Sequence, residues 1–300
     1  MVGRPRRVGL DGRLRGQLGG LHQTDLGAGF HPGIAKFLGD LGDGAGGGVV
    51  NDRQLDGRGH DGGSVPCEVS GGDCRESGQL DDRSTNPAYR KLGYGVVATS
   101  RHIAASDDPD VVTVQGDIGD RAVAERVITA GVERFGRIDT LVNNAGIFIA
   151  KPFTDYTEDD YDAVLGVNLH GFFRITQLAV ERMLEQGGGH VVQITSTLAD
   201  QANSNVTSVL ASLTKGGLQS ATRALAIEYA GRGIHSNAVA LGTIKTPMHP
   251  EENHAALAAL HPVGRMGEVS DIVDAVVYLE DAPFVTGEIL HVDGGQSAGY

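Results

Sequence analysis

The feature that most limits the fold of this chain is the uneven distribution of glycine along it. Of the 45 glycines in 300 residues, 22 lie in residues 1–88, where no helical or strand periodicity persists over a useful length. The run Asp40–Gly48 shows the problem, because glycine loses much backbone entropy on ordering and offers no side chain to bury. We therefore expect residues 1–88 to form a separate, mostly disordered Gly-rich segment.

Two interpretations of this Gly-rich segment stay open. It is either a regulatory tail or a non-native leader, such as the product of an upstream start site or a shifted reading frame. We favour the leader because turn signals such as Asp43-Gly44 and Asp61-Gly62 recur with no apolar pattern between them. Both cysteines, Cys67 and Cys74, also lie here, and their spacing completes no zinc motif, so we expect unpaired thiols.

From about Tyr89 onward, strand-like and helix-like segments alternate. The stretch from Tyr89 to Gly93 is typical of the last turn of a helix that stops at glycine. Short apolar runs predict strands at 96–99, 111–114, 140–142, 190–194, 236–240 and 288–292. Amphipathic or helix-length segments predict helices at 120–135, 157–186, 208–230 and 269–279. This alternation requires crossover connections, so residues 89–300 are expected to form an α/β domain with a Rossmann-like, doubly wound parallel sheet.

One polar residue interrupts the apolar stripe of the long helix predicted at 157–186. The stripe consists of Tyr161, Leu165, Asn168, Phe172, Ile175 and Ala179. A buried amide such as Asn168 costs free energy unless it is hydrogen-bonded. Either it is a satisfied core residue that bonds a neighbouring strand, or it opens the helix locally and holds a water for proton transfer.

Six short motifs together resemble those of the short-chain dehydrogenases/reductases, in that family's order and near its spacing. No motif is specific alone, but the ordered set is, and it covers about 89–300. The closest likeness is to the branch related to 3-oxoacyl-carrier-protein reductases. The motifs are Asn143-Asn144-Ala145-Gly146, Val167-Asn168-Leu169, Ile194-Thr195-Ser196, Lys215, Thr243-Ile244-Lys245-Thr246 and Val292-Asp293-Gly294-Gly295.

The resemblance implies an oxidoreductase that moves a hydride between a nicotinamide cofactor and a carbonyl or secondary alcohol. The implied catalytic residues are Asn168, which holds a relay water, Ser196, which polarises the carbonyl, and Lys215, which holds the nicotinamide ribose and lowers the pKa of a phenol. The implied cofactor-binding residues are Asp117 and Ile118 at the adenine, Asn143, Ala145 and Gly146 after a strand, Lys215 at the ribose, and Gly242, Ile244 and Thr246 near the nicotinamide. Thr195 and Thr197 are weaker candidates for the serine's role.

Two departures from the family pattern concern catalysis and phosphate binding. The family's tyrosine stands four residues before its lysine, and counting back from Lys215 gives Ala211, which has no proton to donate. Ser208 and Ser212 are near, but a serine hydroxyl is too weak an acid to replace a phenol. The first βα unit, with its glycine-rich turn for pyrophosphate, should precede Tyr89 but does not. In the strand order 3-2-1-4-5-6 its strand is central, so we expect the sheet to be interrupted beside 96–99.

The residue after the second strand of the family's order indicates which nicotinamide cofactor is used. That strand ends at Thr99-Ser100-Arg101, with a guanidinium suited to a phosphate and no carboxylate for a ribose diol. NADP is therefore favoured, with NAD as the alternative and a solvated Arg101 as the non-functional interpretation.

Charge and composition narrow the remaining classes of function. A net charge of −13 disfavours nucleic acid and anionic membranes as partners, and no apolar run is long enough to span a bilayer. The histidines are scattered, so we expect no metal site. We predict a cytoplasmic homo-oligomer that acts on a small-molecule carbonyl or alcohol, with activity in doubt because of Ala211 and the missing glycine loop. The alternatives are a non-catalytic family member that binds a nucleotide or forms oligomers, and a misread product whose true version has an intact first unit.

Overall fold

The computed structural model describes residues 86–299, and the predictions for 1–85, including those for both cysteines, lie outside this range. The strands are β1 (Val96–Ser100), β2 (Val111–Gln115), β3 (Thr140–Asn143), β4 (Gly189–Ser196), β5 (Ile234–Leu241) and β6 (Ile289–Val292). The helices are α1 (Asn86–Lys91), α2 (Arg121–Phe135), α3 (Glu158–Leu165), a π-helical segment (Gly166–Gly171), α4 (Phe172–Gln186), α5 (Val209–Tyr229), α6 (His254–Ala258) and α7 (Val269–Glu280). Each predicted strand and helix is present, with ends that differ by at most two residues.

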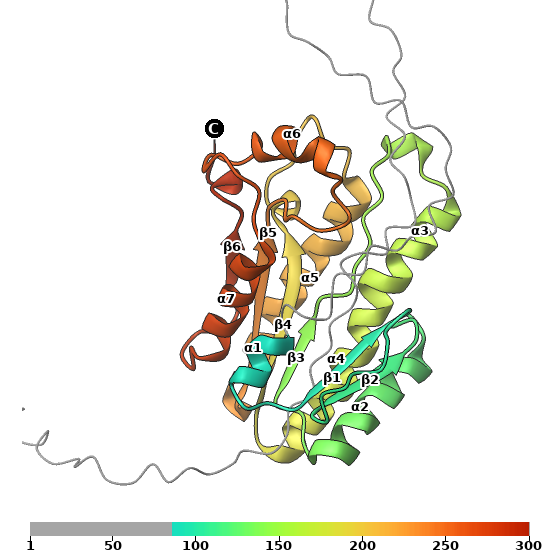
Figure 1. The fold of residues 1–300 in the computed structure, drawn as a ribbon, viewed down its shortest axis with the longest axis vertical. Coiled ribbons are helices and arrows are strands. Elements are labelled where there is room, and N and C mark those ends of the chain that lie inside the picture. The colour runs from blue at the N-terminus through green and yellow to red at the C-terminus, as the bar shows by residue number, and fades with distance from the viewer. Residues whose placement is uncertain (1–85, 300) are drawn as a thin grey trace, which may run out of the picture. The chain divides into compact units, whose positions relative to one another are not determined.

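The strands form two parallel sheets (Figure 1). One contains β1 and β2, and the other has the order β3-β4-β5-β6. Within residues 86–299 no strand lies between β1 and β3, which is where the order 3-2-1-4-5-6 places its first strand. The predicted interruption of the sheet is therefore confirmed for the described part of the chain.

Helices cover both faces of the strands, as the crossover pattern predicts. One apolar cluster joins Val97 of β1 and Leu141 of β3 to α2 and α4. A second cluster joins Val96 and Val142, which point to the opposite face, to α7. Because neighbouring residues of β1 and β3 enter different clusters, both strands are buried on both faces, which is characteristic of a doubly wound α/β fold.

The helix predicted at 157–186 is continuous in direction but changes geometry in its middle. Its start is fixed by a capping box between Thr157 and Asp160. Asn168 lies in the π-helical segment between α3 and α4, where local widening of the helix accommodates one extra residue per turn. The predicted stripe was wrong at its first position, since Tyr161 is 43% exposed and Val164 is buried instead.

A buried polar cluster lies near the amino ends of β3 and β4, away from the carboxyl ends. The carboxylate of Glu280, the last residue of α7, accepts hydrogen bonds from Thr140 (2.7 Å), Tyr89 (3.2 Å) and the Nδ1 of His190 (3.1 Å). Burial alone raises the pKa of Glu280, but the bonds from His190, Thr140 and Tyr89 outweigh it, and the net pKa is lowered. The ionised carboxylate thus joins α1, β3, β4 and α7.

Candidate functional site

Polar and glycine residues gather at the carboxyl ends of the parallel strands. Arg101 follows β1, Asn143 ends β3, Ser196 ends β4 and Gly242 follows β5. In open parallel sheets ligands bind outside this edge, because the loops that leave the strands there enclose a crevice. Most of the residues that the sequence assigns to a site are therefore brought to one edge by the fold itself.

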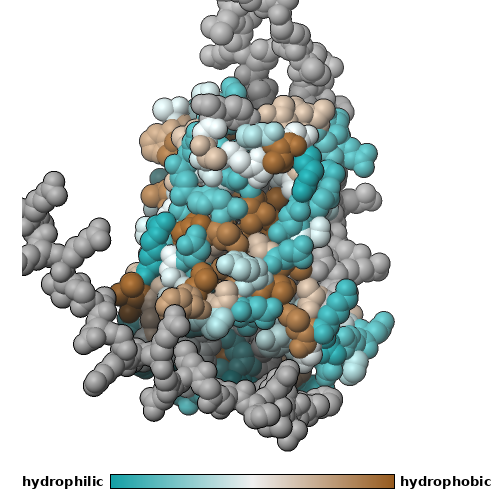
Figure 2. Space-filling model, turned by 90° about the vertical axis from the view of Figure 1, so that its left-hand side faces the viewer, coloured by the Kyte–Doolittle hydropathy of each residue, from teal (hydrophilic) through white to brown (hydrophobic). Residues whose placement is uncertain are grey.

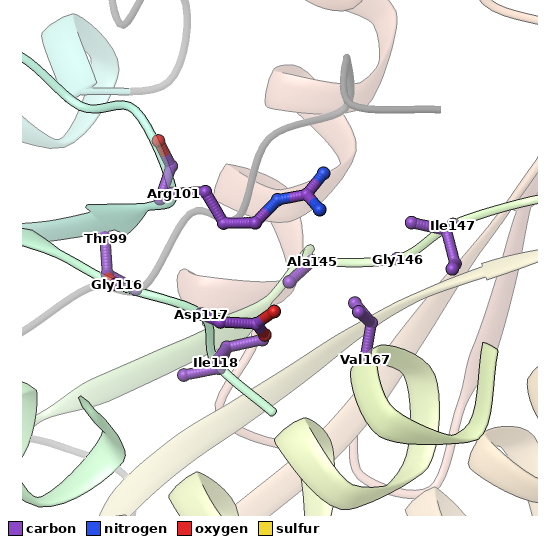
Figure 3. Close-up of a pocket in the computed structure, with 10 residues that line it drawn as sticks. Thr99, Arg101, Gly116, Asp117, Ile118, Ala145, Gly146, Ile147 and Val167 are labelled. Atoms are coloured by element: carbon purple, nitrogen blue, oxygen red, sulfur yellow. The ribbon is translucent and has the colours of Figure 1, made fainter. Parts of the chain in front are cut away.

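A small cleft, open to solvent, lies between the loops after β1, β2 and β3 (Figure 3). The predicted residues Arg101, Asp117, Ile118, Ala145 and Gly146 all line it. The remaining lining residues are Thr99, Ser100, Gly116, Ile147 and Val167. The side chains of Arg101 and Asp117 come from the neighbouring strand ends of β1 and β2 and extend into the cleft in much the same direction (Figure 3), so the cleft offers a cation and a carboxylate on the same side.

The floor of this cleft is held in place by local hydrogen bonds. Asp117 Oδ1 accepts the backbone N–H of Gly119 at 2.8 Å, which fixes the turn after β2. Ile118 packs directly on Gly171 of the π-helical segment, where an added Cβ would lie 2.9 Å from the Ile118 Cγ2. The glycine at position 171 therefore lets the adenine-side loop predicted at 117–118 approach the helix closely.

Asn143 and Asn168 brace the loop after β3 instead of pointing into the cleft. Asn143 Nδ2 donates to Thr176 of α4 at 2.9 Å, and Asn143 does not line the cleft. Asn168 Oδ1 accepts the Ile147 N–H at 2.9 Å, while its Nδ2 donates to the Ile147 carbonyl and to Thr214, both at 3.1 Å. The amide of Asn168 is thus hydrogen-bonded by the chain, but to the loop at Ile147 and to Thr214 of α5, whereas the first interpretation expected a neighbouring strand. The helix is also opened there, as the second interpretation expected.

The ammonium of Lys215 lies at the end of β4. Its Nζ donates to the carbonyl of Ile194 at 2.8 Å, and an added Cβ on Gly146 would come within 2.8 Å of it. Burial lowers the pKa of Lys215 from 10.5 to about 8. A side chain at position 146 would therefore require the Lys215 ammonium to shift.

Among residues 86–299 the hydroxyl of Ser196 has no hydrogen-bond acceptor. Its Oγ accepts the Leu198 N–H at 3.2 Å and caps the short turn that follows β4. Ser212 cannot take over the acid's role, because its hydroxyl is already committed to the carbonyl of Leu198 at 2.9 Å. Ala211 is buried in α5 one turn before Lys215, so the position of the family's phenol lies inside the fold without a proton donor.

The loop after β5 forms an isolated parallel β-bridge between Ile244 and Gly267. Gly267 donates to the carbonyl of Thr243 and accepts from the N–H of Lys245, both at 2.9 Å. In this geometry the N–H and carbonyl of Ile244 point away from Gly267, and neither has a hydrogen-bond partner among residues 86–299. The Ile244 side chain is buried in the core, so only its backbone groups can meet a ligand. Thr246 lies in the same loop and accepts at its carbonyl from His249.

Sequence reasoning missed His261, which lies beneath this loop and is 3% exposed. An added Cβ on Gly242 would lie 2.7 Å from His261 Nε2 and 2.9 Å from the Asp293 Cα. The glycine at 242 is thus explained by close packing of an imidazole and a neighbouring turn. A histidine shortly before Pro262, among scattered histidines, carries no sequence signal of this contact.

Within the described range no three His, Cys, Asp or Glu side chains are grouped as a metal site would require. No helix in that range is long and apolar enough to cross a membrane.

A parallel α/β fold with a cleft at the carboxyl edge, lined by Arg101 and by glycine and alanine, defines a dinucleotide-binding class of protein. The family model described as Enoyl-(Acyl carrier protein) reductase matches residues 92–297. This chain belongs to the short-chain dehydrogenase/reductase family.

Relatives within the family are consistent with the 3-oxoacyl reductase-like branch. The chain is 37% identical over 193 residues to the 3-oxoacyl-[acyl-carrier-protein] reductase FabG of Thermotoga maritima, covering 63% of this chain and 76% of that protein. It is similar to the solved structure of ElxO with NADP bound, with a TM-score of 0.68 and 28% identity over 72% of this chain and 94% of that one. It is also similar to 3-ketoacyl-(acyl-carrier-protein) reductase from Brucella melitensis complexed with NADH, with a TM-score of 0.67 and 27% identity over 71% of this chain and 92% of that one.

Proposed function

We propose that this chain is an NADP(H)-linked oxidoreductase of the 3-oxoacyl reductase type, acting on a small carbonyl or secondary alcohol, whose turnover is limited by the alanine at position 211. The observation that carries the proposal is the position of Lys215, whose ammonium lies between the Ile194 carbonyl and Gly146, a residue that lines the cleft. In the family resemblance this lysine holds the nicotinamide ribose.

Residues at both ends of the site fit a nicotinamide dinucleotide. At the adenosine end, Arg101 can pair with a 2′-phosphate and Asp117 lines the same cleft. At the other end, the N–H and carbonyl of Ile244 match the acceptor and donor of a carboxamide. The fit is incomplete in the middle, because residues 86–299 contain no glycine-rich turn that opens a helix beside β1. We therefore expect weak binding, with NADPH bound more tightly than NADH.

The chain's own residues supply three parts of the reaction. NADPH, when bound, supplies the hydride for the carbonyl carbon. Ser196 donates a hydrogen bond from its hydroxyl to the carbonyl oxygen as negative charge develops there, without giving up the proton. Lys215, with its pKa lowered to about 8 by burial, places a positive charge beside the ribose. Asn168 is proposed to keep the loop at Ile147 in place and to hold the relay water at its remaining acceptor site.

Proton delivery is the step that the chain supports least, and it gives the test. General acid catalysis typically contributes ~10²–10⁴-fold to the rate. We expect NADPH oxidation with an acetoacetyl thioester to be barely measurable for the wild type and to rise by at least about tenfold in Ala211→Tyr. The rise should disappear when Lys215→Ala is added.

The matched control is Ala211→Phe, which adds nearly the same volume at the same position without a hydroxyl. It should fold like Ala211→Tyr and stay as slow as the wild type. Equal rates for the Phe and Tyr variants would refute the assignment of position 211. Fast wild-type turnover that survives Lys215→Ala would refute the proposed function of this site.

A second function, a nucleotide-binding subunit without turnover, is favoured by the same alanine. Calorimetric titration together with the rate assay separates the two functions. The non-catalytic function predicts that the wild type binds NADPH and that Ala211→Tyr does not raise the rate. Either protein would be cytoplasmic.

We also propose that the chain forms homo-oligomers. Apolar side chains remain exposed on α4 and α5, with Phe173 62%, Leu213 59% and Ile227 84% exposed. The face that carries α7 and the edge strand β6 likewise mixes apolar and polar surface (Figure 2). Sedimentation velocity is the measurement, and a monomer at micromolar concentrations would contradict the proposal.

A further inference from the structure

His261 joins three segments at the carboxyl ends of β5 and β6. It follows α6, its ring packs against Gly242 after β5, and its Cβ side contacts the turn at Gly294 after β6. The turn that His261 begins is tied to the same region, since the Val263 N–H donates to the Gly294 carbonyl at 3.2 Å. A single buried ring therefore sets the spacing between these segments.

The hydrogen-bond partners of His261 fix its tautomer. Nδ1 faces the carbonyl of Leu257 at 2.9 Å and so must carry the proton. Nε2 faces the N–H of Thr243 at 2.9 Å and so must be the acceptor. The ring is therefore a neutral imidazole, with one nitrogen anchored to the end of α6 and the other holding the loop after β5.

The hydrogen bond from Thr243 to His261 adds to the β-bridge that orients Ile244. Gly267 already binds the carbonyl of Thr243 and the N–H of Lys245, and an ion pair joins Lys245 to Glu268. Only the Thr243 N–H is left for His261. With both backbone groups of Thr243 bound, the N–H and carbonyl of Ile244 are held toward the opposite side, where the proposed function places the nicotinamide carboxamide.

We propose that His261 is a positioning residue for cofactor binding, which acts by accepting the Thr243 N–H at Nε2 and so presenting the Ile244 peptide groups to the carboxamide. The inference rests on the proposed function for its ligand. The hydrogen bond itself can be tested without any ligand.

Two substitutions separate the two ring nitrogens. In His261→Gln the side-chain oxygen can reach the place of Nε2 and accept from Thr243, but the bond to Leu257 is lost. In His261→Asn the shorter amide can keep the bond to Leu257, but it cannot reach Thr243. Both variants replace the imidazole by an amide of lower volume, so a purely structural role should destabilise both and should not favour the Gln variant.

The ligand-free measurement is amide hydrogen exchange followed by NMR. We expect the Thr243 amide to exchange slowly in the wild type and in His261→Gln, and rapidly in His261→Asn. The unpaired Ile244 amide of the same loop is the internal reference and should exchange faster than that of Thr243 in the wild type. A wild-type Thr243 amide as fast as that of Ile244, or equal loss of protection in both variants, would overturn the proposal.

The ligand-dependent measurement is calorimetric titration with NADPH. We expect the dissociation constant of His261→Gln to lie within about threefold of the wild type and that of His261→Asn to rise about five- to tenfold, which is the effect of one hydrogen bond. Added NADPH should slow exchange at the Ile244 amide. If wild type binds no NADPH, the proposed function fails, and the Thr243 exchange data still decide the role of His261. Equal affinities in the two variants would overturn it.

Discussion

Lys215 shows at the scale of one residue how a functional position costs stability. Its ammonium is bonded to a single backbone carbonyl, that of Ile194, and burial lowers its pKa to about 8. Below that pH the folded protein must keep a poorly solvated charge, whereas the unfolded chain keeps it in water. The buried ammonium therefore does not stabilise the fold, which fits the role in ligand binding that we propose for Lys215.

This argument predicts the sign of a pH effect. Between pH 8 and pH 10.5 the unfolded chain holds the lysine proton and the folded protein has lost it, so the unfolded state binds more protons and stability rises with pH. As the pH rises from 8 to 10.5, the free energy of unfolding of the wild type should therefore increase by roughly 2–3 kcal/mol relative to that of Lys215→Met. Urea unfolding at fixed pH values measures it.

The control for this measurement is Lys91→Met, at an exposed position in the last turn of α1. Its difference from the wild type should stay nearly constant from pH 8 to pH 10.5. A constant difference for Lys215→Met as well would mean that the ammonium is solvated in the folded protein.

The sequence predicted which residues lie at the carboxyl edge of the sheet, but not the contacts that they make there. The spacing before Lys215 was enough to predict that Ala211 takes the place of the family's tyrosine. Nothing in the sequence shows that Asn143 turns toward Thr176 or that Gly242 accommodates His261, because both contacts join segments far apart in the chain. The roles of the predicted site residues themselves remain proposals.

At the scale of elements, the Glu280 cluster explains how α1 is attached to the domain. Tyr89 of α1 donates to a carboxylate at the end of α7, which also accepts from β3 and β4. Asn237 of β5 donates to Nε2 of His190, and its amide is oriented by the Glu288 N–H and the Val285 carbonyl. The Nε2 of His190 therefore accepts from Asn237, and its Nδ1 faces the Glu280 carboxylate.

Removing the charge of Glu280 should loosen α1 and β3 together. We expect Glu280→Gln to lower the free energy of unfolding by about 2–3 kcal/mol at pH 7, because the Gln amide group must face donors from Tyr89 or His190. The folded pKa of Glu280 is lowered, so its contribution is complete above the unfolded pKa and is lost as pH falls through the folded one. The gap between wild type and variant should thus narrow below about pH 4.5.

Glu185→Gln is a matched control, since Glu185 is exposed on α4 in an ion pair with Arg182. Exposed ion pairs contribute about 0–1 kcal/mol to stability, so the free energy of unfolding of this variant should be close to that of the wild type. Chemical denaturation from pH 3 to pH 7 makes the comparison. An effect of Glu280→Gln no larger than that of Glu185→Gln would show that the buried cluster does not hold α1.

Element ends were predictable where local chemistry sets them. Gly136, with φ +80°, ends α2, and Gly93, with φ +88°, follows α1 as the glycine stop requires. The π-helical segment was not predictable in detail, because it depends on the bonds between Asn168 and the loop at Ile147. The apolar periodicity also wrongly predicted that Tyr161 is buried, because the first turn of α3 does not pack on the core.

At the scale of the whole molecule, the interruption of the sheet within residues 86–299 and the weak cofactor binding that we propose would have one cause. The strand that would lie between β1 and β3 is followed in this fold by the turn and helix N-terminus that bind pyrophosphate. The family match begins at Leu92, after that unit. Order and handedness of the remaining strands follow from crossover rules, so the sequence sufficed to predict both the fold and its gap.

Restoring the unit should therefore repair the sheet and the binding site together. We expect a chain in which residues 1–85 are replaced by the first strand, glycine turn and helix of the Thermotoga maritima FabG to bind NADPH about 100-fold more tightly, since several charge-assisted hydrogen bonds to phosphate are added. It should also melt at a higher temperature, because the new strand pairs on both edges. Calorimetric titration and thermal unfolding measure the two effects.

The same graft with its turn glycines changed to valine should keep the gain in melting temperature and lose the gain in affinity, because side chains there exclude the phosphates. A glycine-containing graft that melts higher yet binds NADPH no better would show that the missing turn is not what limits cofactor binding.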